Sequence, residues 1–414
     1  MDSLPAPSSK RLYGRTFVIA VVSQSVFVMG NTLMTHHARW VKALGGSETD
    51  VGKVLGFGAV IGLLVRPWMA QWINRIGARN MWGIGYLVFG VGALCNIFLD
   101  ELNWTVYAIR SIFVFGSSIV FASSLTYVTQ ISPRERRTEA IGIVGAGGFI
   151  GMLVGPALGD MLIGSPNPAA GNFFSLFILA GLFMVLPGCL LTLLPPTRLS
   201  EAPAAVSLKD FLNTIQRHWP GTILLVDIAF GLCMTIPFGF LATFIDVEQL
   251  AIPGVPVIGL YFWSYAGWGL TVRVALRKLP DQVGRRKVLL VGMLFMSAGL
   301  FSYSLVDSGH PWLIMVPALI CGTGHALMFH TMTALTMERF PYEVRGTGSS
   351  FALMALETGT ICGAPILGMI AEHSYDRMFV VMGIFVGSVA LLYFCSSLPV
   401  WRERARSRDE QLTF

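Results

Sequence analysis

The fold is decided by a stretch of sequence that occurs twice, once in each half of the chain. Residues 52–77 read GKVLGFGAVIGLLVRPWMAQWINRIG, and residues 259–284 read GLYFWSYAGWGLTVRVALRKLPDQVG. A constant offset of 207 aligns three landmarks, namely Gly52 with Gly259, Arg66 with Arg273, and Gly77 with Gly284. An offset of 208 then aligns Trp104 with Trp312 and Gly155 with Gly363. Two similar halves in a membrane protein commonly hold a site between them, and rocking of one half against the other exposes it to alternate sides.

The composition is that of a membrane protein. Of the 414 residues, 54% are hydrophobic and only 13% are charged, and the mean hydropathy is +0.66. Runs of about twenty apolar residues, long enough to cross a bilayer, recur along the chain. We place them at 16–40, 51–72, 81–99, 104–130, 138–163, 172–194, 220–245, 256–276, 288–306, 312–337, 346–370 and 378–400. The predicted fold class is an all-α integral membrane protein with 12 transmembrane helices in two pseudosymmetric six-helix bundles.

A break rich in proline, alanine and polar residues separates the halves. We expect an N-terminal six-helix bundle over residues 1–195, a cytoplasmic linker over 196–219 and a C-terminal six-helix bundle over 220–414. Within the linker, Leu208, Phe211, Leu212 and Ile215 have the spacing of a short amphipathic helix that lies along the membrane face. An unstructured linker is the alternative.

The distribution of charge predicts the orientation. The net charge of +6 is not gathered on one segment, as it would be for nucleic-acid binding, but is spread over alternate loops. The loops on one side hold nearly all the basic residues, whereas those on the other side hold only Arg39, Lys42, Lys53 and Arg377. Because positive loops remain in the cytoplasm, we expect both termini to be cytoplasmic and the protein to lie in the plasma or inner membrane.

Two cytoplasmic loops carry a signature. Residues 70–79 read AQWINRIGAR, and residues 277–286 read RKLPDQVGRR. Both resemble the loop signature of the major facilitator superfamily, which is a Gly, three residues, Asp-Arg, any residue, Gly and two basic residues. The resemblance implies a gate that comprises Asn74, Arg75, Gly77, Asp281, Gly284, Arg285 and Arg286. Because Asn74 replaces the acid of the first copy, we expect the electrostatic part of this gate to depend on Asp281.

The fifth predicted helix carries Gly147, Gly151, Gly155 and Gly159 at four-residue spacing, which places them on one face where another backbone can approach closely. Together with Pro156 they resemble the superfamily's fifth-helix motif, which is commonest among exporters that exchange substrate for protons. Asp160 stands where a second glycine is usual. The resemblance implies a gating role for Gly151, Gly155 and Pro156, and the eleventh helix repeats the pattern with Gly359, Gly363 and Pro365.

In this superfamily the first, fourth, seventh and tenth helices line a central cavity. Polar residues recur every seven positions on two of them, as Gln24 and Asn31 on the first and as Arg110, Ser117 and Ser124 on the fourth. Residues seven apart share a helix face, and polar groups inside a bilayer face protein or water rather than lipid. We therefore expect these five residues to form the first-half wall of a substrate pathway.

The repeat ranks the candidates in the second half. The offset of 208 maps His325 onto Ser117, whereas His330 maps onto Ala122, which lies off the polar stripe. His325 is therefore favoured as a substrate or proton contact. Five residues at about 100° each place the two imidazoles roughly 140° apart, so we expect no shared metal site. A histidine that only bonds a neighbouring helix is the alternative.

Two acidic residues are candidate proton carriers. Asp227 maps onto Ala20, one turn before Gln24 and on the same face, and an unpaired carboxylate is costly to bury in a membrane. The alternative for Asp227 is a static pair with a basic residue. Glu357 lies near mid-membrane in the eleventh helix, two residues off the face that carries Gly359 and Gly363.

Other cations lie at the helix ends. His36, His37 and Arg39 end the first helix on the outer side, and we interpret them as interfacial anchors, with an anion-attracting vestibule as the alternative. Arg66 and Arg273 lie near the inner ends of their helices, where we expect them to hold the gate or a lipid phosphate rather than substrate.

These features predict a secondary active transporter that works by alternating access, with proton-coupled export of a small amphipathic organic molecule. Import of an organic anion, motivated by His36, Arg39 and Arg110, is the alternative. We expect no enzyme, because no nucleophile–base pairing or metal-ligand spacing is present, and all six cysteines lie in predicted spans. The expected partners are a small-molecule substrate, protons and the lipid bilayer, with no nucleic acid, no metal and no cofactor, and the chain is expected to be a monomer.

Overall fold

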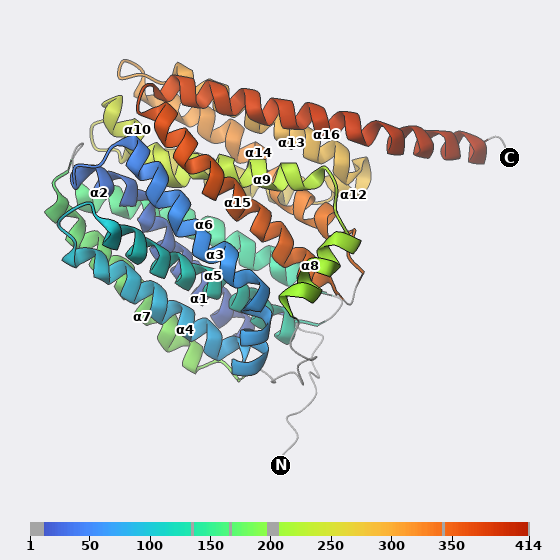
Figure 1. The fold of residues 1–414 in the computed structure, drawn as a ribbon, viewed down its shortest axis with the longest axis horizontal. Coiled ribbons are helices and arrows are strands. Elements are labelled where there is room, and N and C mark those ends of the chain that lie inside the picture. The colour runs from blue at the N-terminus through green and yellow to red at the C-terminus, as the bar shows by residue number, and fades with distance from the viewer. Residues whose placement is uncertain (1–11, 134–135, 165–167, 197–206, 342–343, 413–414) are drawn as a thin grey trace, which may run out of the picture.

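The computed structural model describes residues 12–133, 136–164, 168–196, 207–341 and 344–412 (Figure 1). Eleven helical segments in these ranges are long and apolar enough to cross a membrane. A further helix, α11 (Val257–Ala275), is made less apolar by its glycine and aromatic residues, but its 19 residues still span about 29 Å. The chain is therefore a multi-pass membrane protein with twelve membrane helices in two six-helix bundles, as predicted.

The first bundle consists of six spans, several of which begin or end in a turn of 3-10 helix. The first span is α1 (Arg15–Leu33), η1 (Met34–His36) and α2 (His37–Ala43), and the second is α3 (Glu48–Ile76). The remaining four are α4 (Ala78–Cys95) with η2 (Asn96–Phe98), α5 (Trp104–Ile131), α6 (Arg137–Ile163), and η4 (Ala170–Phe173) with α7 (Phe174–Thr192).

The second bundle repeats this order. Its first span is α9 (Ile223–Thr235), η5 (Ile236–Phe240) and α10 (Leu241–Val247), where Pro237 accompanies a π-helical turn. Next come α11, the short α12 (Leu279–Val283), α13 (Arg285–Ser302) with η6 (Tyr303–Leu305), and η7 (Pro311–Ile314) with α14 (Met315–Met337). The last two are α15 (Arg345–Ala371) and α16 (Tyr375–Leu412).

The helix predicted within the linker is present as α8 (Leu208–Arg217). Ser207 and Asp210 form a capping box at its N-terminus, which satisfies backbone N–H groups that the first turn leaves free. Phe211 and Ile215 are buried against the protein, while Leu208 and Leu212 are exposed. The unstructured alternative is thus wrong for residues 208–217, while the bundle boundaries at residues 195 and 220 stay a prediction.

The glycine stripes pack helices within each bundle. A Cβ atom on Gly151 would lie 2.6 Å from Val28, and one on Gly155 would collide with Thr32, so the fifth span packs tightly against α1. In the second bundle, Gly359 and Gly363 of α15 make the equivalent close contacts with α9. Glycine is required here because two helix backbones touch.

The most extensive contacts between the bundles are those of α3 with α15 and of α6 with α11, and a smaller contact joins α2 to α10. Figure 1 shows α2 and α10 at one end of the molecule and α8 and α12 at the opposite end. We call the first the clamp end, for the ion cluster described below, and the second the linker end. The charge pattern predicts that the linker end is cytoplasmic.

Candidate functional site

The predicted first-half wall joins α1 to α5. The hydroxyl of Ser117 donates to Oδ1 of Asn31 over 2.9 Å, so the two polar stripes meet at this level. Gln24 is buried, and its Oε1 has no hydrogen-bond partner among the described residues. Ser124 is also buried, but its hydroxyl bonds Phe121 O of its own helix.

Arg110 on α5 is a cation without a counter-charge in the described part of the chain. Its buried Nε and Nη1 atoms have no hydrogen-bond partner there. The guanidinium carbon lies 4.4 Å from the centroid of the Phe113 ring, and Gly58 of α3 leaves room for the side chain. A buried guanidinium with free donors is a ready partner for an anionic group.

Arg66 and Glu357 form an ion pair across the bundle interface. Nη2 of Arg66 lies 2.6 Å from Oε1 of Glu357, and Nε also donates to that oxygen over 3.2 Å. Arg66 is buried, and Oε2 of Glu357 has no partner among the described residues. The expectation that Arg66 holds a lipid phosphate is therefore wrong, because its guanidinium binds a carboxylate of α15.

Asp227 on α9 is fully buried and faces α14. Its Oδ2 accepts a 2.7 Å hydrogen bond from the hydroxyl of Thr336, while Oδ1 is buried without a partner in the described ranges. Those ranges show no basic residue in an ion pair with it. The alternative of a static pair between Asp227 and a cation is thus not what the described residues form.

His325 lies in an aromatic cluster between the bundles. Its Nδ1 is 2.6 Å from the hydroxyl of Tyr265, and its ring centroid lies 5.2 to 5.8 Å from those of Phe149, Phe230 and Phe329. Phe149 comes from α6 of the first bundle, so this histidine contacts both bundles.

His330 points to a different neighbour. Its Nδ1 lies 3.4 Å from Nη2 of Arg273, and the guanidinium carbon of Arg273 lies 5.7 Å from the Phe149 ring. No group of three His, Cys, Asp or Glu side chains in the described residues is arranged to hold a metal ion.

The clamp end is closed by three charged side chains from three spans. Arg39 donates to both carboxylate oxygens of Asp246, one of them over 2.6 Å, and its Nη1 donates to Oδ1 of Asp160 over 3.0 Å. Oδ2 of Asp160 accepts from the backbone N–H of Ile258. Arg39 is only 4% exposed, so the interpretation as an interfacial anchor is wrong: it is a buried bridge between the bundles.

Further contacts reinforce this end. His36 bonds Pro156 O through Nε2 over 2.9 Å, and the backbone N–H of Thr49 donates to Glu372 over 3.1 Å. Gly52 and Gly368 bring the backbones of α3 and α15 into contact. Because Arg39 is neutralised by two carboxylates and His36 is buried, neither forms a vestibule that would attract anions.

The two signature loops contain the predicted tight reversals. Gly77 and Gly284 have φ of +89° and +104°, which favour glycine. Asp281 lies 3.6 Å from Arg285, and Arg285 also pairs with Glu338 at the end of α14. These bonds stay within the second bundle. Arg75 is exposed, and Arg286 is half-buried.

Sequence reasoning missed the clamp, although a signal was present. Arg39 and Asp246 are 207 residues apart, which is the offset of the repeat. Two residues that are equivalent in the repeat lie next to each other when both are close to the pseudo-two-fold axis that relates the halves. Opposite charges at two such positions therefore predict an ion pair across the interface.

Comparison with known proteins covers nearly the whole chain. Residues 16–356 and 278–412 match the model of the Major Facilitator Superfamily. A putative multidrug resistance protein, MdtD of Cronobacter sakazakii, is 25% identical over 80% of this chain and 80% of its own length. The riboflavin transporter RibZ of Clostridioides difficile is 22% identical over 67% and 70%, respectively.

Solved structures share the fold. The nucleoside transporter NupG superimposes with a TM-score of 0.73 at 11% identity, covering 92% of this chain and 99% of its own. A D-xylose–proton symporter gives a TM-score of 0.71 at 15% identity, with coverage of 89% and 96%.

Proposed function

The chain belongs to the Major Facilitator Superfamily, and from that premise we propose that it uses the proton gradient to export a small amphipathic organic molecule. Membership of this family makes the chain a membrane transporter rather than an enzyme. The direction of transport, the coupling ion and the chemical class of the substrate are the proposed parts.

One observation carries the proton coupling: Asp227 is buried, and no described residue supplies a cation to pair with it. An ionised carboxylate in an apolar site is expensive unless it is paired, so a carboxyl group in this position is stable when it holds a proton. The only hydrogen bond in the described ranges comes from Thr336, which can also accept from a protonated carboxyl. Asp227 would release its proton when water reaches it in one state of the transport cycle.

Export is supported by two features. The fifth-helix pattern of Gly151, Gly155 and Pro156 resembles that of exporters, and the relative MdtD of Cronobacter sakazakii is named as a putative multidrug resistance protein. Aromatic rings around His325, together with the polar residues Asn31 and Ser117, would offer a substrate both apolar surface and hydrogen bonds.

Placement of the linker end in the cytoplasm, a location in the plasma or inner membrane, and a monomeric state complete the proposal. In this arrangement the two signature loops form the cytoplasmic gate, with Asn74 and Arg75 in the first loop and Asp281, Arg285 and Arg286 in the second. The charged cluster of Arg39, Asp160 and Asp246 would form the opposite gate.

A second candidate is transport of an organic anion. Arg110 favours it, because the free donors of this buried guanidinium would pair with a substrate carboxylate or phosphate. Arg39 and His36 no longer support it, since both already have partners.

A transport assay tests the proposal after a ligand is found. Purified protein is screened for thermal stabilisation by a library of metabolites and drugs, because a ligand that binds the folded state raises its stability. Proteoliposomes are then loaded with that ligand, and its movement is followed with and without a pH gradient.

Asp227→Asn should bind the ligand and exchange it without a gradient, but should not move it against a concentration gradient. Glu357→Gln is the matched comparison. Full gradient-driven transport by Asp227→Asn would refute the assignment of the proton to Asp227. If Glu357→Gln alone abolished it, the coupling site would lie on α15. Arg110→Gln separates the substrate classes, since it should weaken binding of anions far more than of neutral ligands.

A further inference from the structure

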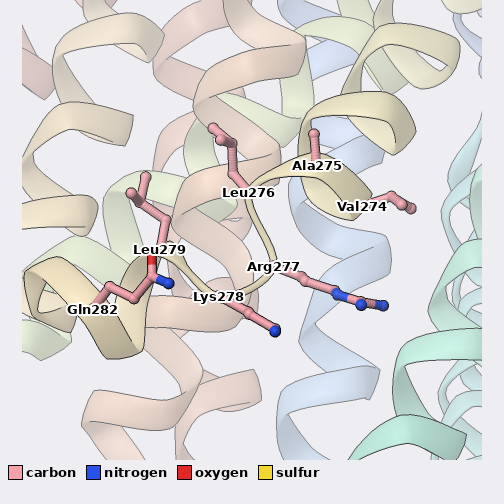
Figure 2. A pocket seen from close by; sticks show the side chains of 7 residues that line it. All are labelled: Val274, Ala275, Leu276, Arg277, Lys278, Leu279 and Gln282. Atoms are coloured by element: carbon pink, nitrogen blue, oxygen red, sulfur yellow. The ribbon is translucent and has the colours of Figure 1, made fainter.

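The loop between α11 and α12 contains a cationic pocket that the transport proposal does not use. The pocket has a volume of about 460 Å³ and is lined by Val274, Ala275, Leu276, Arg277, Lys278, Leu279 and Gln282. Figure 2 shows the side chains of Arg277 and Lys278 directed to the same side of the loop. A pocket of this size can hold a small polar group together with part of an attached chain.

No described residue compensates the charges of this pocket. Arg277 and Lys278 are exposed, and neither makes an ion pair with a described residue. The neighbouring acid, Asp281, is already paired with Arg285. Two adjacent cations with free donors therefore face the solvent at the end of a membrane helix.

Apolar side chains continue the pocket toward the membrane. Val274 and Leu276 are 59% and 39% exposed at the end of α11 that lies next to α12. Exposed apolar residues on a membrane helix face the acyl chains of lipid. A cation pair directly beyond them is at the depth of the lipid phosphates.

The repeat provides an internal comparison. The offset of 207 maps Arg277 onto Ala70 and Lys278 onto Gln71, which are both uncharged. Arg277 also stands where the loop signature has glycine. The basic pair is thus a feature of the second loop alone and not a requirement of the shared turn.

We propose that this pocket binds the phosphate headgroup of an anionic phospholipid, with Arg277 and Lys278 on the phosphate and Val274 and Leu276 against the acyl chain. The combination of two cations with lipid-facing apolar surface distinguishes such a ligand from a free phosphate ion, which would have no use for the apolar part. Each basic residue near a charged lipid surface changes binding about fivefold.

Native mass spectrometry of the full chain in detergent tests this site with phosphatidylglycerol and phosphatidylcholine of the same acyl chains. Wild type should retain one phosphatidylglycerol more tightly than phosphatidylcholine. Arg277→Ala with Lys278→Gln, which restores the residues of the first loop, should weaken phosphatidylglycerol binding roughly 30-fold. Lys278→Gln alone should weaken phosphatidylglycerol binding about fivefold. This single variant replaces the double variant if the latter cannot be purified.

The matched control is Lys209→Gln with Arg217→Gln on α8, which removes the same net charge from exposed positions outside the pocket. It should bind phosphatidylglycerol as wild type does. Equal losses in both double variants, or none in the pocket variant, would overturn the proposal. So would thermal stabilisation by inorganic phosphate that matches phosphatidylglycerol, because the site would then hold a soluble anion.

Discussion

The two interfaces between the bundles are equivalent in the repeat but differ in chemistry. In one, Arg66 of α3 pairs with Glu357 of α15. The repeat maps Arg66 onto Arg273 and Glu357 onto Phe149, and in the other interface these two residues form a cation–π contact. Thus the same pair of positions carries a carboxylate on one side of the molecule and an aromatic ring on the other.

The comparison shows which features the two interfaces share and which they do not. Close backbone contacts are present in both interfaces at the clamp end, through Gly52 with Gly368 and through Gly259 with Ala157. Within the described ranges, only the interface of α3 and α15 holds an ion pair between its two helices. A proton that neutralised Glu357 would therefore weaken that interface, whereas the contact between Arg273 and Phe149 would not respond in this way.

Removal of Arg39 should have the largest effect, because this side chain bridges the bundles: it pairs with Asp246 of α10 and with Asp160 of α6. Arg39→Gln leaves Asp160 and Asp246 facing each other without a cation, and loss of one partner of a buried ion pair costs about 3 kcal/mol or more. We expect the clamp end to open. Spin labels at Lys53 and Arg377, which are exposed on opposite bundles, should report a new population at longer distance.

Arg136→Gln is the control for this measurement. Arg136 lies 2.7 Å from Glu139, and the two side chains are 34% and 40% exposed, so loss of this ion pair should leave the clamp end unchanged. Unchanged distances in Arg39→Gln, or equal changes in both variants, would show that the charged cluster does not hold this end closed.

The two equivalent arginines should differ in their contribution to stability. Arg66→Gln strands a buried carboxylate and should lower the free energy of unfolding by about 3 kcal/mol. Arg273→Gln removes a cation–π contact and should cost about 1 kcal/mol. Thermal unfolding of the purified variants measures both.

The double variant of Arg66→Gln and Glu357→Gln should recover most of the loss, because no unpaired charge remains. An equal decrease in the free energy of unfolding for Arg66→Gln and Arg273→Gln would contradict the proposed difference between the interfaces.

The smallest effect concerns the signature loops. Asp281 is 74% exposed and pairs only with Arg285 among the described residues, so Asp281→Ala should change stability by no more than about 0.5 kcal/mol. If the acid latches the gate in another state, this variant should nevertheless transport more slowly than Asn74→Ala at matched expression. Equal rates would argue against a dominant second-half gate.

The sequence was sufficient to predict the helices and their packing pattern. Apolar runs of fixed length identified the spans, and four-residue glycine spacing predicted a close backbone contact, now located between α6 and α1. It also predicted the reversals at Gly77 and Gly284, since only glycine adopts their φ readily.

The partners of individual charges were less accessible from sequence. Arg66 and Glu357 are 291 residues apart, and no local pattern reports which helix faces which across the interface. Arg39 lies at a helix end, where membrane anchors are common, and its burial depends on two acids from distant spans. The interpretation of Arg39 as an anchor was wrong because it used only the position of this residue at a helix end. It did not use the symmetry of the repeat.

The central claim is that the contact between α3 and α15 at the clamp end must open in every transport cycle. The backbone N–H of Thr49 donates to the Glu372 side chain, so these two positions are close together. A disulfide between Thr49→Cys and Glu372→Cys therefore tests the claim directly. Oxidation should abolish transport in proteoliposomes and reduction should restore it, while each single-cysteine variant, which retains the six native cysteines, should be insensitive to the oxidant. Undiminished transport by protein that is fully cross-linked would contradict the account.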